Sequence, residues 1–389
     1  MMDCILTKVR ECEFSFARLA DNYAELATLQ NVLQNPQYHA EGDVFRHTEM
    51  VCETLVSFPE WQALCSEEQE ILLTAAAFHD IGKPICTKLE DGQWVSPKHT
   101  IVGEKVFRRM AYQEADRFGL TFAQRELLAK LIRFHGLPVW FWKKKRMEFD
   151  LLKAAESIPL RLLYLLSKAD VLGRIAGNRK DISGNLPNNV LQNQKSEHFI
   201  DHVELFGDYA KELGIWENAY NFTNSYSKFQ YFRKNNIWQG AELFDNTTFD
   251  VYLMAGLPLS GKDSWIAKNG GELPVISLDA IREELGFPPT KKTQQVVHIA
   301  TERARKLLRS QQPFIWNATN IIAETRQKLI LLFAGYGARV HIIYLEVPYR
   351  ELLRRNQKRE RYIPEKVLED MIRKLEVPAP WEGFEVLYL

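Results

Sequence analysis

The pattern of hydrophobic and polar positions changes character about two thirds of the way along the chain. Before about residue 248, apolar residues recur at helical spacing, and the segments carry helix-boundary signals. Ser66–Gln69 and Thr121–Gln124 have capping-box spacing, and Ser96–Pro97 predicts a third helix start. The helix that begins at Thr121 is expected to end at His135–Gly136. Because no alternating strand pattern occurs here, this part is predicted to be all-α.

Beyond about residue 249, short apolar runs alternate with helical stretches of ten or more residues. The runs read FDVYLMAG, PVISLD, PFIWNAT, VHIIYLEV and, at the end of the sequence, FEVLYL. Strands separated by helices predict a parallel sheet covered by helices on both faces. We therefore expect a two-domain protein, in which an all-α domain precedes an α/β domain.

The domain boundary is predicted in a segment of loop composition. Residues 177–195 are rich in Asn and Gly and lack apolar periodicity. Residues 196–245 again look helical, and they could belong to either domain. The predicted organisation is a first domain at 1–178, a loop and helical connector at 179–245, and a second domain at 246–389.

The composition is that of a globular protein. Hydrophobic residues make up 46% and charged residues 26% of the 389 residues, which excludes disordered and fibrous classes. Fifty basic and fifty acidic residues give zero formal net charge, so phosphate or nucleic-acid binding must come from local sites. Five cysteines without a CxxC pair favour reduced thiols. With no signal-peptide pattern and no run of 18 apolar residues, a cytoplasmic protein without a membrane span is expected.

A glycine-rich loop follows the first predicted strand. The segment GLPLSGKD matches GxxxxGK, with a strand before it and a helix after it. Backbone amides of such a loop surround phosphate oxygens, and Lys262 reaches the β- and γ-phosphates. Asp263 replaces the Ser or Thr that ligates Mg²⁺, and Ser264 points about 100° away around the helix. The residues predicted to bind nucleotide are Gly256, Leu257, Pro258, Leu259, Ser260, Gly261, Lys262, Asp263 and Ser264.

Four charged residues suggest how a phosphate could be transferred at this loop. Asp279 ends the second predicted strand, where it could take the proton of an attacking hydroxyl or simply cap the next helix. Arg282 follows one turn later and could hold a phosphate of the acceptor. Arg355 and Arg359 lie four residues apart, hence on one helix face, and could close over the transferred phosphate. The alternative for this basic helix is a solvated surface.

Histidines and aspartates occupy inward positions of the helices predicted in the first half. His47, the pair His79–Asp80 and Asp170 follow the apolar stripes of three separate segments. A single inward histidine is usually an ordinary core residue, but a buried carboxylate is costly unless it is paired or bound to metal. Imidazole and carboxylate ligands suit Mn, Fe, Co, Ni or Zn. The predicted metal ligands are His47, His79, Asp80, His99, His135 and Asp170.

The order His47, HDIGK at 79–83 and Asp170 resembles the HD-domain metal phosphohydrolases. With His99 and His135 added, the pattern resembles the branch of that superfamily that binds two metals. The resemblance implies that Asp80 bridges the two metals. Lys83 is then placed to meet a substrate phosphate, with an ordinary surface lysine as the alternative. The remaining histidines are interpreted as structural or exposed: His39, His198, His202, His298 and His341.

GLPLSGKD, ISLDAIREELG and RRNQKR, in this order, resemble the 5′-kinase domain of phage and bacterial polynucleotide kinases. The resemblance implies that Lys262 clamps phosphate and that Asp279 is the general base. It also implies that Arg282 holds the acceptor phosphate and that Arg355 and Arg359 form a lid.

Together, the two halves resemble the bacterial HD-Pnk end-healing proteins. The resemblance implies that the first domain uses two divalent transition metals to remove 2′,3′-cyclic and terminal phosphates. The second domain would phosphorylate 5′-hydroxyl ends of RNA or DNA with ATP or another NTP and Mg²⁺. A separate ligase would seal the ends, since no ligase motif is evident. Two alternatives stay open: a metabolic nucleotide hydrolase fused to a small-molecule or nucleoside kinase, and a nucleotide sensor that controls the phosphohydrolase.

Overall fold

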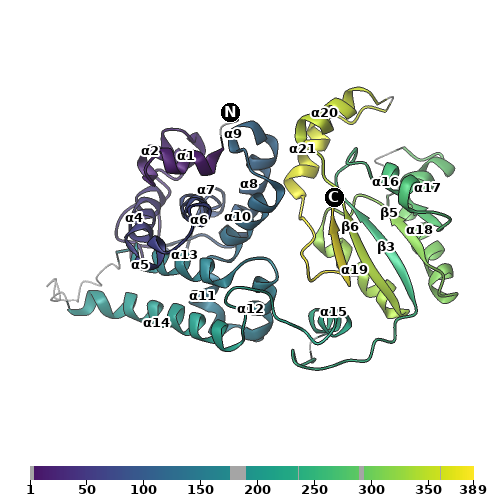
Figure 1. Ribbon diagram of the computed structural model, residues 1–389. Helices are drawn as coiled ribbons and strands as arrows, with labels where there is room; N and C mark the ends of the chain where they lie inside the picture. Colours follow the sequence, from purple (N-terminus) through teal and green to yellow (C-terminus); the bar gives the residue numbers. More distant parts are fainter. Residues whose placement is uncertain (1–3, 176–189, 235, 289–292, 360) are drawn as a thin grey trace. The chain divides into compact units, whose positions relative to one another are not determined.

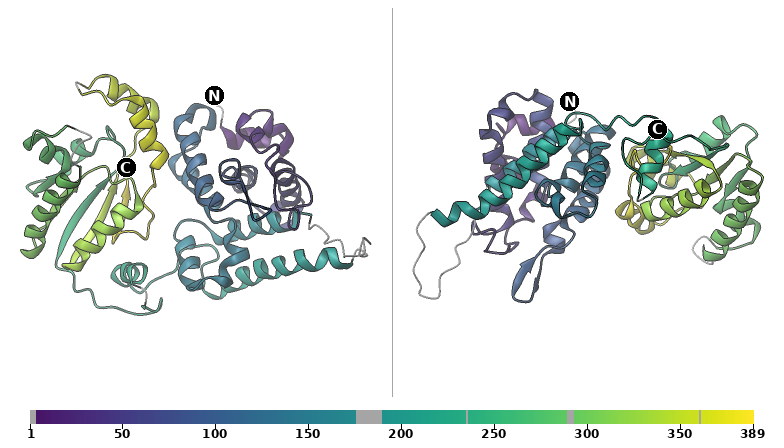
Figure 2. Two further views of the ribbon diagram at one scale, coloured as in Figure 1. Left: turned by 180° about the vertical axis from the view of Figure 1, so that it is seen from behind. Right: turned by 90° about the horizontal axis from the view of Figure 1, so that it is seen from below.

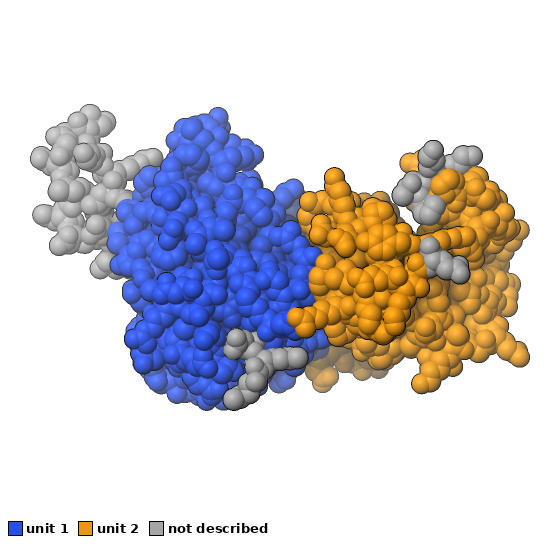
Figure 3. All heavy atoms as spheres, turned by 90° about the horizontal axis from the view of Figure 1, so that it is seen from above, with its two compact units in different colours: residues 1–220 blue, residues 221–389 orange. Residues whose placement is uncertain are grey.

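The protein divides into two compact units, residues 1–220 and 221–389, which Figure 3 shows in blue and orange. The structure is a computed structural model that describes residues 4–175, 190–234, 236–288, 293–359 and 361–389. Of the loop predicted at 177–195, residues up to 189 lie outside the described residues, and the rest begins helix α14 (Val190–Glu212). Helix α14 belongs to the first unit and α15 (Ser225–Arg233) to the second, so the division falls inside the predicted connector.

The first unit is helical, as the sequence predicts (Figure 1). Helix α6 is its central element, because residues 70–78 are all buried, and α4, α10 and α13 pack around it. The helices of this unit before α14 are α1 (Ile5–Glu11), α2 (Phe16–Ala20), α3 (Ala24–Ala27), α4 (Val44–Ser57), α5 (Pro59–Gln62), α6 (Ser66–Phe78), α7 (Lys83–Cys86), α8 (His99–Gln113), α9 (Ala115–Phe118), α10 (Phe122–Phe134), α11 (Leu137–Trp140), α12 (Met147–Ala155) and α13 (Leu160–Leu172).

Helix starts and ends follow the sequence signals only in part. The capping box at Thr121 is confirmed: its Oγ1 accepts a hydrogen bond from the Gln124 amide at 3.2 Å. The end of this helix at Phe134 is confirmed as well. The box at Ser66 is wrong, because Cys65 precedes α6 and Ser66 is its first residue. The start at Ser96 is also wrong: its hydroxyl bonds to the Thr87 hydroxyl at 2.8 Å, and α8 begins at His99.

A short hairpin, which the sequence pattern did not predict, interrupts the helices. Strands β1 (Lys88–Glu90) and β2 (Gln93–Val95) pair in antiparallel fashion, and the hairpin protrudes from the helical unit (Figure 2, right). Asp91 and Gly92 connect them with φ of 49° and 75°, the positive values that a two-residue hairpin turn requires. Strands of three residues are too short to show alternation, but the Asp-Gly pair was a usable signal.

The second unit is an α/β domain with a five-stranded parallel sheet, which confirms the predicted fold class. The strand order is β4-β5-β3-β6-β7, and β3 lies at the centre with most residues buried. The strands are β3 (Phe249–Ala255), β4 (Val275–Ser277), β5 (Phe314–Asn317), β6 (Ala338–Tyr344) and β7 (Glu385–Tyr388). The helices after α15 are α16 (Lys262–Asn269), α17 (Leu278–Glu284), α18 (Thr293–Arg309), α19 (Ala323–Gly335), α20 (Tyr349–Gln357) and α21 (Glu365–Lys374).

This strand order determines where a ligand can bind in the second unit. The chain leaves β3 toward β4 on one side of the sheet, whereas β6 flanks β3 on the other side. Such a reversal of strand order opens a crevice at the carboxyl ends of the strands, where open α/β sheets bind ligands. The loop that follows β3 lies at this edge. None of the helices described in either unit has the length and apolar character needed to cross a membrane.

Candidate metal centre and phosphate-binding loop

The six predicted metal ligands meet around Asp80, directly after helix α6. They come from α4, the end of α6, the start of α8, the end of α10, and α13. The Nε2 atoms of four histidines approach the Asp80 carboxylate. The distances are 3.1 Å from His79 and 4.0 Å from His47 to Oδ2, and 3.5 Å from His99 and 3.9 Å from His135 to Oδ1. Asp170 joins through His47, whose Nε2 lies 3.1 Å from Asp170 Oδ1.

Backbone carbonyls orient three of these imidazoles. The Nδ1 atoms of His79, His99 and His135 hydrogen-bond to the carbonyl three residues earlier, at 2.7, 2.8 and 2.9 Å. Since a carbonyl only accepts, Nδ1 carries the proton and Nε2 is left with its lone pair. Partners of this kind fix the tautomer and the ring orientation of metal-binding histidines. When these imidazoles are neutral, their three Nε2 atoms present a lone pair toward Asp80.

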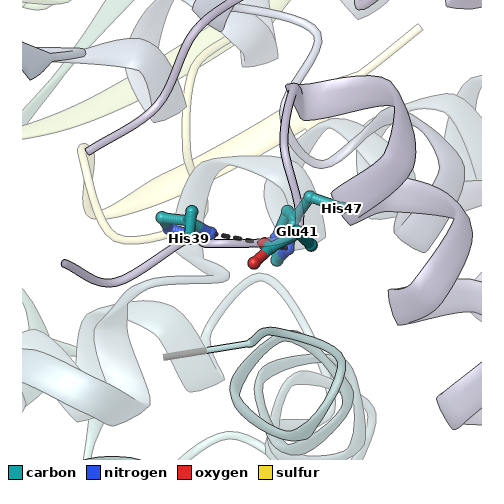
Figure 4. A group of neighbouring side chains, drawn as sticks. All are labelled: His39, Glu41 and His47. Carbon is teal, nitrogen blue, oxygen red and sulfur yellow. Dashed lines mark hydrogen bonds and ion pairs between the residues drawn. The ribbon is translucent and has the colours of Figure 1, made fainter. Parts of the chain in front are cut away.

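A carboxylate orients the fourth imidazole. Glu41 lies in the segment before α4, and its Oε1 is 2.9 Å from the Nδ1 atoms of both His47 and His39 (Figure 4). Its side chain is only 1% exposed. Sequence reasoning missed Glu41, because an irregular segment has no periodicity that marks inward positions. His39, interpreted as structural or exposed, is 14% exposed and belongs to this cluster.

The cluster has the chemistry of a metal site. His79 Nε2 and Asp80 Oδ2 are buried, and among the described residues they contact charged neighbours at ion-pair distance (each other at 3.1 Å, and Lys83 at 2.6 Å from Oδ2) without hydrogen bonds of regular geometry. Burial opposes ionisation of Asp80, but the charges of His79 and Lys83 hold its pKa well below the usual value. Burial lowers the pKa of His99, and that of His135 to about 3, whereas the Asp80 carboxylate outweighs burial and raises the pKa of His79. An ionised carboxylate and neutral imidazoles are the forms that coordinate a cation, so the residues fit divalent metal.

Lys83 lies inside this site rather than on the surface. Its ammonium is 2.6 Å from Asp80 Oδ2 and donates a hydrogen bond to Gln34 Oε1 at 2.7 Å. The residue is 8% exposed, so the alternative of a surface lysine is wrong. Gln34, like Glu41, comes from the irregular segment before α4, and the sequence did not mark it.

Gly82 allows helix α8 to approach the cluster closely. A Cβ atom at this position would lie 2.2 Å from the carbonyl oxygen of His99 and 2.7 Å from the amide nitrogen of Gly103. Only a glycine permits such an approach of two backbones. The contact sets the distance between His99 and the pair His79–Asp80.

A cavity of about 490 Å³ opens beside the cluster. Asp80, His99, His135 and Asp170 line it together with His39. Asp150 also lines it, as do four cationic side chains, of which Arg174 pairs with Asp170 at 2.7 Å: Lys83, Arg133, Lys144 and Arg174. Its aromatic walls are Tyr38, Phe134, Trp140 and Phe199. The cavity thus combines metal-ligand chemistry, positive charge and flat apolar surfaces.

In the second unit, the glycine loop forms the predicted turn between β3 and α16. Gly256, Leu259 and Gly261 have φ of 137°, 66° and 103°, and the loop ends at the first turn of α16. The Lys262 ammonium folds back and donates hydrogen bonds to the carbonyls of Gly256 at 3.1 Å and Leu257 at 2.7 Å. Burial lowers the pKa of Lys262 to about 8, against the opposing effect of Asp263 and Asp279.

Asp263 is held by a neighbouring strand. Its Oδ1 accepts a hydrogen bond at 2.7 Å from the Asn317 amide at the end of β5. Ser264, the next residue, is exposed. Asn317 was not singled out from the sequence, although its place at the carboxyl end of a buried strand is typical of a site residue.

Asp279 and Arg282 form a pair beside the loop. Arg282 Nη1 donates to Asp279 Oδ1 at 2.7 Å, and the Asp279 side chain is 86% exposed. The alternative role of Asp279 as a helix cap is wrong, because Ser277 caps α17 by accepting from the Ala280 amide at 3.3 Å. The carboxylate is therefore open to solvent and pairs with one cation, Arg282.

The two arginines expected on one helix face separate in the structure. Arg355 lies on α20 and donates through Nη1 to the Leu259 carbonyl at 2.9 Å, so it touches the glycine loop directly. Helix α20 ends at Gln357, which places Arg359 beyond it, and the expectation of one shared face is wrong. The charge of Arg359 nevertheless contributes to lowering the pKa of Lys262.

Comparisons with known protein families give a different match for each of the two units. Residues 44–174 match the family model of the HD domain, and residues 251–378 match that of an AAA domain. A crystal structure of a proposed kinase from Chloroflexus aurantiacus matches with 19% identity, over 37% of this chain and 86% of that chain, at a TM-score of 0.30. The first unit is therefore similar to HD domains, and the second unit is similar to AAA domains.

Proposed function

We propose that the protein heals nucleic-acid ends with two activities. The first unit would hydrolyse 2′,3′-cyclic and terminal phosphates, and the second would phosphorylate 5′-hydroxyl ends of RNA or DNA. The observation that carries this proposal is the cavity beside Asp80, because metal ligands, four cations and aromatic walls converge there. A terminal nucleotide with its phosphate has the matching chemistry, and flat bases pack on aromatic rings.

In the first unit, His47, His79 and Asp170 would hold one metal, and His99 and His135 a second, with Asp80 between them. Two divalent ions of Mn, Fe, Co, Ni or Zn supply, when bound, the positive charge that activates water and stabilises phosphate oxygens. Lys83 would add an ammonium against the phosphate. Arg133 and Arg174, which line the cavity, would orient the substrate through charge-assisted hydrogen bonds.

In the second unit, the amides at the start of α16 would hold the phosphates of ATP or another NTP with Mg²⁺. When nucleotide binds, the Lys262 ammonium would give up its hydrogen bonds to the carbonyls of Gly256 and Leu257 and would donate to phosphate oxygens instead. Asp279 would take the proton of the 5′-hydroxyl, and Arg282 would bind the acceptor phosphate. Arg355 contacts the loop already and would complete the positive charge around the transferred group.

ATP affinity is expected to fall as the pH rises above about 8. The pKa of Lys262 is about 8 because burial disfavours its charge, and a bound triphosphate would favour the protonated form. Binding then takes up a proton, and affinity decreases by up to about tenfold per pH unit. Calorimetry of Mg-ATP binding between pH 7 and 9.5, in buffers of different ionisation enthalpy, measures both effects. Lys262→Arg keeps its charge and should remove the decline; constant wild-type affinity without proton uptake would contradict this account.

One experiment tests the proposed function as a whole. The full chain is incubated with an RNA that carries a 5′-hydroxyl and a 2′,3′-cyclic phosphate, together with ATP, Mg²⁺ and Mn²⁺ or Ni²⁺. We expect a 5′-phosphorylated product without its cyclic phosphate. Equal use of free nucleosides and nucleotides would favour the metabolic alternative. Hydrolysis without any phosphoryl transfer would favour the nucleotide sensor.

A further inference from the structure

A basic and aromatic segment adjoins the cavity of the first unit. This segment, Trp140–Arg146, reads WFWKKKR, and it contains the sole run of three or more consecutive basic residues in the sequence. Trp140 is the last residue of α11, Phe141–Lys143 form a turn of 3-10 helix, and the segment ends just before α12. The residues Trp140 and Trp142 are 43% and 40% exposed. Two large aromatic side chains therefore lie at the surface within one short turn.

The aromatic rings are held in place. Trp142 Nε1 donates a hydrogen bond to the Val139 carbonyl at 3.2 Å, and the Trp140 ring meets Phe199 edge-on with centroids 5.5 Å apart. The Lys143 ammonium lies 4.8 Å from the centroid of the Trp140 ring and 4.9 Å from that of Trp142. One cation is thus positioned against both indoles, in the geometry of a cation–π contact.

The three lysines of the segment are not paired with acids. Lys143, Lys144 and Lys145 are exposed, and none of them forms an ion pair with a carboxylate in the described part of the chain. Elsewhere in this unit, exposed cations such as Arg18 and Arg46 pair with glutamates. A protein of zero net charge therefore concentrates unpaired cations at one edge of its cavity.

The segment is continuous with the cavity. Trp140 and Lys144 line the cavity, whereas Trp142, Lys143 and Lys145 do not. Proteins that bind single-stranded nucleic acid without sequence preference use aromatic rings interspersed with cations. Bases stack on the rings, and phosphates pair with the cations. A base-paired strand cannot stack in this way, because its bases already stack within the duplex.

We propose that Trp140–Arg146 binds the single-stranded part of a polynucleotide whose phosphate end lies in the cavity. The proposal rests on the proposed function and specifies its substrate as a strand rather than a mononucleotide. The last nucleotide enters the cavity past Trp140 and Lys144. The preceding nucleotide stacks on Trp142, and Lys143 and Lys145 neutralise its phosphate and the next one.

The test compares two substrates of the same reaction in the full chain. One is a ten-nucleotide RNA with a 5′-phosphate and a 2′,3′-cyclic phosphate, which the P-loop unit cannot phosphorylate; the other is 2′,3′-cyclic AMP. Steady-state kinetics is measured for Trp142→Ala and for the double variant Lys143→Gln/Lys145→Gln. Trp142→Ala should raise KM for the RNA roughly 5- to 150-fold, the range for one lost stack. In the double variant, the slope of log KM against the logarithm of the salt concentration should be smaller by about 1.4, because two phosphate contacts are lost.

The mononucleotide and a matched lysine provide the controls. KM for 2′,3′-cyclic AMP should change less than about twofold in both variants, which also shows that they fold. Lys211→Gln is matched, because Lys211 lies 4.9 Å from the Trp216 ring centroid and does not line the cavity. It should leave both substrates unaffected.

The outcomes separate this proposal from the proposed function. If the wild type hydrolyses both substrates with equal KM, or if the variants keep the KM for RNA, the strand-binding segment is rejected and the phosphohydrolase stands. If neither substrate is hydrolysed but the variants weaken RNA binding in fluorescence anisotropy, the segment stands and the proposed reaction is rejected. Binding of polyglutamate in place of RNA would overturn the assignment in favour of an acidic protein partner.

Discussion

Asp80→Asn is expected to eliminate hydrolysis of 2′,3′-cyclic phosphate, by roughly a thousandfold or more. Asp80 is the carboxylate that four imidazoles approach within 4.0 Å, so it would be the central ligand of the proposed metal site. Loss of a partner that merely supports a ligand typically costs about 10- to 100-fold in metal affinity or activity. Loss of the central ligand should reduce activity by more than that range. Because the substitution keeps the side-chain volume, a packing defect would not account for the effect.

Metal content and both reactions are measured on the same preparation of this variant. Elemental analysis should show that the variant retains less Mn, Fe, Co, Ni or Zn than the wild type. Phosphoryl transfer should stay near normal, because the P-loop domain uses other residues. Asp208→Asn, an exposed aspartate with a side chain 78% accessible, is the control and should keep both activities. A variant that retained metal and hydrolysis would remove Asp80 from the centre.

Lys262→Ala is expected to have the reverse effect, with loss of phosphoryl transfer and normal hydrolysis. The ammonium is the cation at the centre of the glycine loop, where its hydrogen bonds to Gly256 and Leu257 show that it reaches the loop interior. Removing one preorganised electrostatic contact to a transition state typically costs about 100- to 1000-fold in kcat. The exposed Lys268 at the other end of α16 provides the control, Lys268→Ala.

Transfer of labelled γ-phosphate to a 5′-hydroxyl oligonucleotide measures this effect. Hydrolysis of 2′,3′-cyclic AMP in the same samples tests whether the sites are independent. If Lys262→Ala or Asp80→Asn removed both activities while circular dichroism showed a folded protein, the two sites would be coupled. The assignment of one reaction to each unit would then be wrong.

Helical periodicity explains why so much of the first cluster could be predicted. His47 and Asp170 lie on apolar stripes, and burial of those stripes brings their side chains together from α4 and α13. Glu41 and Gln34 could not be found in this way. They lie in an irregular segment, where the direction of a side chain depends on tertiary contacts and not on spacing along the sequence.

The second unit shows a similar limit. Alternation of apolar runs and helices predicted all five strands, and the glycine motif placed Lys262 correctly at the start of the helix that follows the loop. The separation of Arg355 from Arg359 could not be anticipated, because a helix end after Gln357 has no proline or glycine to mark it. The hydrogen bond from Asn317 to Asp263 joins residues 54 positions apart, and neighbouring strands determine it rather than local sequence.

The close contact at Gly82 makes the metal centre sensitive to size as well as to charge. With no room for a Cβ atom between Gly82 and the backbone of α8, even one methyl group would act as a wedge. It would push His99 away from His79 and Asp80 while every ligand remained in the sequence. No larger side chain fits at position 82. The arrangement of the metal-binding residues can therefore be lost through packing alone, by a substitution that introduces neither a charge nor a polar atom.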